Sequence, residues 1–138
     1  MSALWERSLS ELLVLERSIF RKLGEITGIT RELAEAVDRE DQVSVRLLLT
    51  GRHRPLLELQ ELNAALELMR CDLSGEDEAA FDRLVRRASP TESEAERDIA
   101  EQIAQNRRAL EQLSALDRRV NEKLCRDKSF YRNREAAL

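Results

Sequence analysis

The chain contains few residues that interrupt helices. Its 138 residues include only four glycines and two prolines, and aromatic residues make up 4% of the total. Charged residues make up 36%, and Leu, Ala, Glu and Arg recur along the chain, a composition typical of long helices. A chain of this length fits one domain with a single core. The composition therefore predicts an all-α protein whose helices bury apolar stripes.

Residue patterns typical of enzymes are also missing. His53 is the only histidine, so neither a zinc-binding helix nor a paired Glu-x-x-His di-iron site can be assembled. The four glycines are scattered, which excludes a glycine-rich phosphate loop, and neither Ser nor Cys has a recognisable nucleophile setting. We therefore expect no enzymatic activity, no metal site and no cofactor.

The two cysteines and the apolar residues indicate a cytoplasmic protein. Cys71 and Cys125 have neither the close spacing of a zinc or redox motif nor the density of a disulfide-rich secreted domain, so we expect reduced thiols. The first twenty residues alternate apolar with charged side chains, and nowhere do about 18 apolar residues follow one another. The sequence predicts neither a signal peptide nor a membrane span.

The net charge argues against nucleic acid or an anionic membrane as the main partner. It is −4, with a pI near 5.2. The sign changes along the chain, since residues 76–101 carry nine acidic and four basic side chains, whereas residues 123–138 carry five basic and two acidic ones. The C-terminal end is thus locally basic.

Apolar spacing predicts two long helices in the first half of the chain. The first, over residues 3–39, carries apolar residues at steps of three, four and seven: Trp5, Leu9, Leu12, Ile19, Leu23, Ile26, Leu33 and Val37. Gly24 and Gly28 inside it mark a weak turn, a bend or a close approach of a neighbouring helix. The second helix, over residues 43–71, has Asp41 as its N-cap, and Gly51 with Pro55 predicts a kink rather than an end.

Two further helices follow. The segment 74–77 (Ser-Gly-Glu-Asp) resembles a capping box and begins a short amphipathic helix through Phe81, Leu84 and Val85. The segment 89–92 (Ser-Pro-Thr-Glu) combines an N-cap hydroxyl, a proline at the first helical position and a glutamate at the third, which predicts the start of the last helix.

The lengths of these helices predict the architecture. Helices of 30 to 36 residues would be about 45 to 55 Å long, which is too long for a compact globule of this mass. We therefore expect an elongated antiparallel helical bundle or coiled coil of three long helices plus one short helix, forming a single domain over residues 1–126. Residues 127–138 would form a basic, flexible C-terminal tail.

Candidate binding residues lie on the last helix and in the tail. We expect the stripes of the first two helices to be internal core, whereas the stripe of the last helix fits either core or a surface for a partner protein. That stripe consists of Ile99, Ile103, Leu110, Leu113, Val120 and Leu124, with Asn106 and Asp117 as polar residues in the seam. In the tail, Phe130 and Tyr131 are candidate anchors of a docking peptide.

The order of these parts resembles the FlgN-like flagellar export chaperones of bacteria. The likeness is carried by segment 33–41 (Leu-Ala-Glu-Ala-Val-Asp-Arg-Glu-Asp), the leucines at 47–49, segment 56–62 (Leu-Leu-Glu-Leu-Gln-Glu-Leu) and segment 115–124 (Ala-Leu-Asp-Arg-Arg-Val-Asn-Glu-Lys-Leu). The resemblance implies a cytoplasmic chaperone that binds the amphipathic C-terminal helix of flagellar hook-filament junction proteins and delivers these hook-associated proteins to the type III export apparatus. The alternative is a self-associating structural coiled coil or adaptor, which would form a homodimer.

Overall fold

The chain is helical throughout the residues that the structure describes. The structure is a computed structural model, which describes residues 3–86 and 93–136, with the side chains of residues 5–86 and 93–126. It contains helices α1 (Ala3–Asp38), α2 (Gln42–Asp72), α3 (Glu76–Arg86) and α4 (Glu94–Ala136), and no strand lies within the described ranges. The predicted all-α class, with three long helices and one short one, is confirmed.

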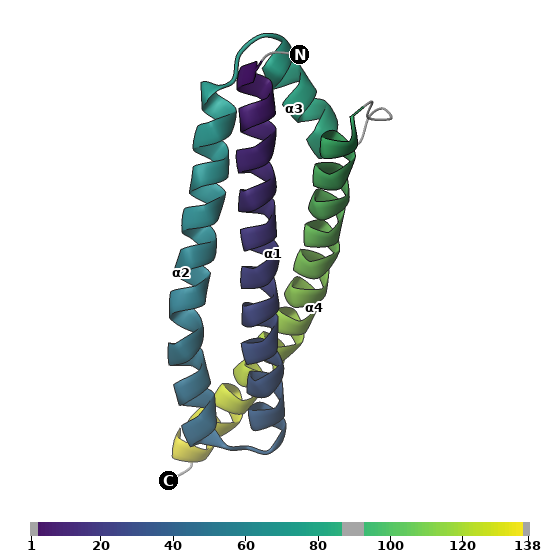
Figure 1. Ribbon diagram of the computed structural model, residues 1–138. Helices are drawn as coiled ribbons and strands as arrows, with labels where there is room; N and C mark the ends of the chain where they lie inside the picture. Colours follow the sequence, from purple (N-terminus) through teal and green to yellow (C-terminus); the bar gives the residue numbers. More distant parts are fainter. Residues whose placement is uncertain (1–2, 87–92, 137–138) are drawn as a thin grey trace.

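The helices form an elongated bundle with α1 between its two long neighbours. Helix α2 runs antiparallel to α1, α3 lies at the end of the bundle near the N-terminus, and α4 returns alongside α1 (Figure 1). Helix α1 packs along both α2 and α4, whereas α3 packs mainly on α4. Towards its C-terminal end, α4 crosses α1 to the side of α2 (Figure 1). The three long helices therefore meet at the end of the molecule opposite α3.

Specific caps make the chain reverse between α1 and α2. Glu40 has a φ of +57°, and the backbone N–H groups of Glu40 and Asp41 donate to the carbonyls of Val37 and Ala36 (3.1 and 2.9 Å). This is the Schellman arrangement that closes a helix, with Glu40 where glycine is commonest. Asp41 then accepts hydrogen bonds from the backbone N–H and the hydroxyl of Ser44 (3.1 and 2.6 Å). The predicted N-cap of α2 is confirmed.

The glycines and the internal proline do not end their helices. A Cβ atom added to Gly24 or Gly28 would meet nothing within 4 Å outside the local helix, so, of the three alternatives that the sequence left open, a close approach of a neighbouring helix holds at neither position. Helix α2 continues through Gly51 and Pro55, as expected, and Pro55 is its one buried residue. The kink expected at Pro55 stays a prediction.

The two later helices begin close to the predicted positions. Helix α3 starts directly after Gly75, which has a φ of +60°. The predicted cap at Ser89 lies outside the described residues. The described part of α4 begins at Glu94, and Ser93 caps it, because its hydroxyl accepts a hydrogen bond from the N–H of Glu96 at 3.1 Å.

The core is a series of three apolar clusters along the bundle axis. The first joins α1, α3 and α4, the second joins the middle of α1 to α2 and α4, and the third lies where the three long helices meet. Their buried members are Trp5, Leu9, Leu12, Leu73, Phe81, Leu84, Ile99 and Ile103; then Ile19, Leu23, Ile26 and Leu113; then Leu33, Val37 and Val120. Every cluster depends on α1, which is therefore the central helix of the fold.

Candidate helix-binding surface

Most of the stripe predicted on α4 lies inside the bundle. Ile99, Ile103, Leu113 and Val120 are buried, and all four belong to clusters shared with α1. Leu124 is partly buried against the third cluster, whereas Leu110 is half exposed. Of the two alternatives that the sequence left open, internal core describes this stripe. It is not an open groove in this structure, and partner binding at these residues stays a prediction.

The predicted seam residue Asn106 joins α4 to α1. Its amide Nδ2 donates to the backbone carbonyl of Glu16 at 2.8 Å and to the Glu16 carboxylate at 2.6 Å, and its Oδ1 accepts from Gln102 at 3.1 Å. Burial raises the pKa of Glu16, while the hydrogen bond from Asn106 and the charge of Arg107 oppose that rise. Because a buried polar group needs a specific partner, this pair fixes the register of the two helices.

The second seam residue, Asp117, connects all three long helices. Its carboxylate accepts a hydrogen bond from Arg52 of α2 at 2.6 Å, and the same guanidinium nitrogen lies 3.3 Å from the hydroxyl of Thr30 on α1. These contacts lie on α4 between Leu113 and Val120, near the point where α4 crosses α1. Both polar seam residues therefore act within the bundle.

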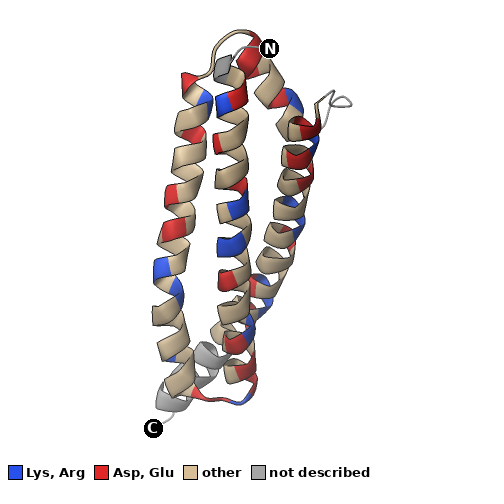
Figure 2. Ribbon diagram, viewed as in Figure 1, with Lys and Arg blue, Asp and Glu red and all other residues tan. Residues whose placement is uncertain are grey.

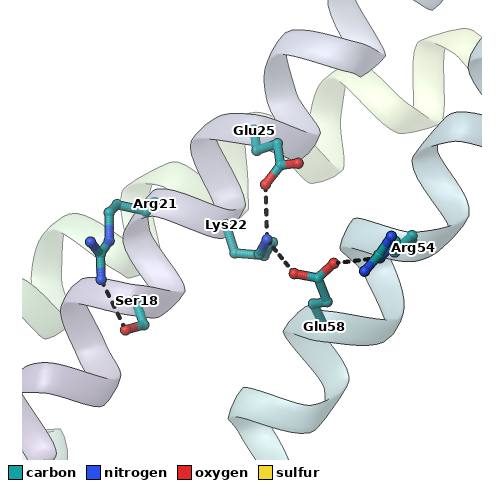
Figure 3. A network of polar contacts seen from close by, with 6 residues as sticks. All are labelled: Ser18, Arg21, Lys22, Glu25, Arg54 and Glu58. Carbon is teal, nitrogen blue, oxygen red and sulfur yellow. Dashed lines mark hydrogen bonds and ion pairs between the residues drawn. The ribbon is translucent and has the colours of Figure 1, made fainter.

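An ion-pair network joins α2 to α1. Lys22 donates to Glu58 of α2 at 2.7 Å and to Glu25 of α1 at 2.9 Å, and Arg54 lies 3.4 Å from Glu58 (Figure 3). The hydrogen bond with Glu58 raises the pKa of Lys22, and the same bond lowers the pKa of Glu58. The leucines of α2 that flank Glu58 on this side, Leu56, Leu59 and Leu62, pack against the second cluster.

A second row of residues, four of them large and apolar, lies on the opposite side of α2, exposed to solvent. We define the outer face of α2 as eight exposed residues that follow one another at alternating steps of four and three: Val43, Leu47, Thr50, Arg54, Leu57, Glu61, Ala64 and Leu68. Its four large apolar residues are 70%, 68%, 45% and 67% exposed in chain order. At 3.6 residues per turn, this row lies opposite the residues that pack on α1.

The remaining exposed large apolar residues among the described side chains do not form such a row. They are Val14, Phe20, Leu49 and Leu110, and they are distributed over three helices. Single exposed apolar side chains are normal on soluble proteins, whereas several on one face of a helix indicate a binding surface. The outer face of α2 is therefore the candidate functional site.

Our sequence reasoning missed this surface, although a signal for it was present. The sequence predicts that the apolar stripe of α2 is internal core, and the residues that pack towards α1, such as Leu48 and Leu62, fit that prediction. Val43, Leu47, Leu57 and Leu68 do not fall on that stripe, so α2 is apolar on two opposite sides. A helix with this pattern needs covering on both sides, and α1 covers only one.

Charge is distributed unevenly along α2. Residues 42–57 contain three arginines and no acidic residue, whereas residues 58–72 contain four acidic residues and one arginine. The basic half lies near the end of the bundle where α4 crosses, and the acidic half near α3 (Figure 2). The outer face therefore has a direction, which a bound helix can recognise through complementary charge.

Other predicted features lie partly beyond what the structure describes. The backbone of Phe130 and Tyr131 belongs to α4, but their side chains lie outside the described ones, so the docking tail and its boundary at residue 127 stay predictions. Within the described residues, no group of three or more His, Cys, Asp and Glu side chains could hold a metal ion. The described helices also include none with the length and apolarity needed to span a membrane.

Comparison with known proteins gives no further constraint. Neither the scan of family models nor the searches of curated proteins and of solved structures finds a match to this chain.

Proposed function

We propose that this protein is a non-enzymatic helical adaptor or chaperone that binds an amphipathic helix of another protein on the outer face of α2. The single observation that carries the proposal is the row of exposed apolar residues along that face. Burying such a row is favourable by roughly 25 cal/mol per Å² of apolar surface before the cost of ordering the partner is subtracted. A helix with apolar residues at steps of three and four has the matching shape.

The proposed partner is the amphipathic C-terminal helix of a flagellar hook-filament junction protein. The resemblance of the sequence to FlgN-like export chaperones supports this choice, and it also makes the cytoplasm the proposed location. Covering that helix before type III export would prevent premature assembly. The elongated shape of α2 suits such a role, because the helix offers a binding face about 38 Å long between Val43 and Leu68.

A peptide titration tests both the function and the position of the surface. A fluorescent peptide with the C-terminal helix of a hook-filament junction protein is titrated with the full chain, and binding is followed by anisotropy. We expect saturable binding, which Leu57→Glu weakens by at least about tenfold, because a charge at the centre of an apolar contact must lose its water. Circular dichroism should show unchanged helicity, since Leu57 contributes to none of the three clusters.

The matched control is Leu110→Glu, which introduces the same charge at a leucine of similar exposure on α4. We expect this variant to bind the peptide like the unchanged protein. If Leu110→Glu abolishes binding and Leu57→Glu does not, the partner binds α4 and the proposed surface is wrong. If the unchanged protein does not bind the peptide, the chaperone assignment is wrong.

A further inference from the structure

We infer that the outer face of α2 pairs with the outer face of α2 in a second copy of this chain, antiparallel, about a two-fold axis near Leu57. This inference deepens the proposed function, and rests on it for its biological meaning, because it names what covers the same surface before a partner helix arrives. The free protein would then be a homodimer, and binding of a partner would require exchange of one helix for another.

The spacing of the outer face is that of a coiled-coil seam. The eight residues advance by four and three in strict alternation, which averages 3.5 residues per step and keeps a row facing a neighbouring helix. The row continues for more than three heptads, from Val43 to Leu68. A helix inside one bundle does not need large apolar residues on its solvent side, so the four on this row indicate a second helix.

Two pairs of seam residues are complementary in the antiparallel direction about this axis. Arg54 and Glu61 lie on opposite sides of the proposed axis at equal distance, and Leu47 and Leu68 do the same farther out. Rotating one helix by 180° about that axis brings Arg54 of one copy within about one helical turn of Glu61 of the other, twice in each dimer. The same rotation brings each Leu47 near a Leu68.

Arg54 is accessible for this contact, although it is already paired within its own chain. Its side chain is 90% exposed and lies 3.4 Å from Glu58, its ion-pair partner among the described side chains. Glu61 is also exposed and has no ion pair among the described side chains of its own chain. Polar residues at seam positions of a coiled coil set the register and orientation of the helices. Arg54 and Glu61 have opposite charges, so they can attract each other across such a seam.

A parallel pair would have the opposite electrostatics. It would place Arg54 beside Arg54 and Glu61 beside Glu61, and it would align the basic halves of both helices with each other. Like charges at such positions are destabilising. The antiparallel pair instead places each basic half against an acidic half.

Charge reversal on separate chains tests the inference. Arg54→Glu and Glu61→Arg are made individually in the full chain, and mass is measured by sedimentation equilibrium at low salt. We expect the unchanged protein to be a dimer and each single variant to dimerise at least about tenfold more weakly. An equimolar mixture of the two variants should form a heterodimer, because the carboxylate introduced in one chain then faces the guanidinium introduced in the other. At the other of the two contacts between positions 54 and 61, the unchanged Glu61 of the Arg54→Glu chain faces the unchanged Arg54 of the Glu61→Arg chain. No effect within one chain can produce that recovery.

The matched control is Glu67→Arg, which makes the same charge change on α2 at an exposed residue outside the seam. This variant should dimerise like the unchanged protein. The inference is wrong if the unchanged chain is monomeric, if Leu57→Glu remains a dimer, or if the mixed variants do not associate. If the chain dimerises and the charge variants behave as expected but the chain does not bind the peptide, only the proposed function is contradicted. If the chain is a monomer that binds the peptide on α2, only the dimer is contradicted.

Discussion

Leu110 and Leu113 lie one turn apart on α4, but only Leu113 is buried in the bundle. Leu113 is 7% exposed and packs with Ile19, Leu23 and Ile26, whereas Leu110 is 50% exposed. We expect Leu113→Ala to lower the free energy of unfolding by roughly 2 to 5 kcal/mol, because it leaves a cavity in the core. Leu110→Ala should cost less than about 1 kcal/mol. Urea denaturation followed by circular dichroism measures both, and equal losses would contradict the burial assigned to these residues.

Glu16 makes the stability of the bundle depend on pH. Burial raises the pKa of Glu16 above its ordinary value of 4.5, so the folded protein holds this proton more tightly than the unfolded chain does. The resulting stability is complete below pH 4.5 and is lost as the pH rises through the folded pKa. Glu16→Gln keeps an oxygen for the Asn106 amide but cannot ionise.

We therefore expect Glu16→Gln to unfold at a higher urea concentration than the unchanged protein at about pH 7. The difference between the two unfolding midpoints should disappear as the pH falls below the ordinary pKa of 4.5. The control is Glu11→Gln, at an exposed carboxylate on the same helix, which should produce no such difference. A constant difference at all pH values would mean that the gain comes from packing and not from the charge of Glu16.

At the scale of single helices, the glycines inside α1 offer a direct test. Gly24 and Gly28 lie in a helix interior, and a Cβ at either position meets nothing within 4 Å. We expect Gly24→Ala and Gly28→Ala each to stabilise the protein by about 1 kcal/mol, since Ala loses less backbone entropy on folding. Gly75→Ala should instead destabilise it by roughly 1 to 2 kcal/mol, because the φ of +60° at Gly75 is strained for a residue with a Cβ. Thermal unfolding of the three variants distinguishes these effects by sign.

The existence and extent of the helices could be predicted from local signals. The steps between Trp5, Leu12 and Ile19 identified α1, and Asp41 identified the start of α2, because both are properties of neighbouring residues. The start of α4 was predicted at Ser89, which lies outside the described residues, whereas the structure describes Ser93 as a cap. Local patterns locate a helix more reliably than they locate its first residue.

At the scale of the whole molecule, the sequence could not say which stripe is covered. The apolar stripes of α1 and α4 have the same spacing as the outer face of α2, and only the packing of the helices separates core from surface. Helix α4 crosses α1 and so buries Val120 between α1 and α2, whereas Leu47 and Leu68 stay about two-thirds exposed within the described chain. The candidate site was therefore assigned to α4 from the sequence, whereas the structure leaves α2 open.

The contact between Arg52 and Asp117 joins α2 to α4 near the point where α4 crosses α1. The Arg52 side chain is 13% exposed, so Asp117→Ala leaves a mostly buried guanidinium without its carboxylate. We expect each single change, Arg52→Ala or Asp117→Ala, to lower the free energy of unfolding by about 1 to 2 kcal/mol. The double variant should lose less than the sum of the two, by about 1 kcal/mol, because the two side chains act through one contact.

The control for this cycle is the pair Lys123 and Asp38, which joins α4 to α1 and lies exposed. Its coupling should stay within about 0.5 kcal/mol, because water screens exposed ion pairs. If both pairs couple equally, burial of Arg52 does not strengthen its contact, and the crossing is held by the apolar cluster around Val120 alone. If only the buried pair couples, Asp117 helps to hold α4 against α2 at the end of the bundle where α2 begins.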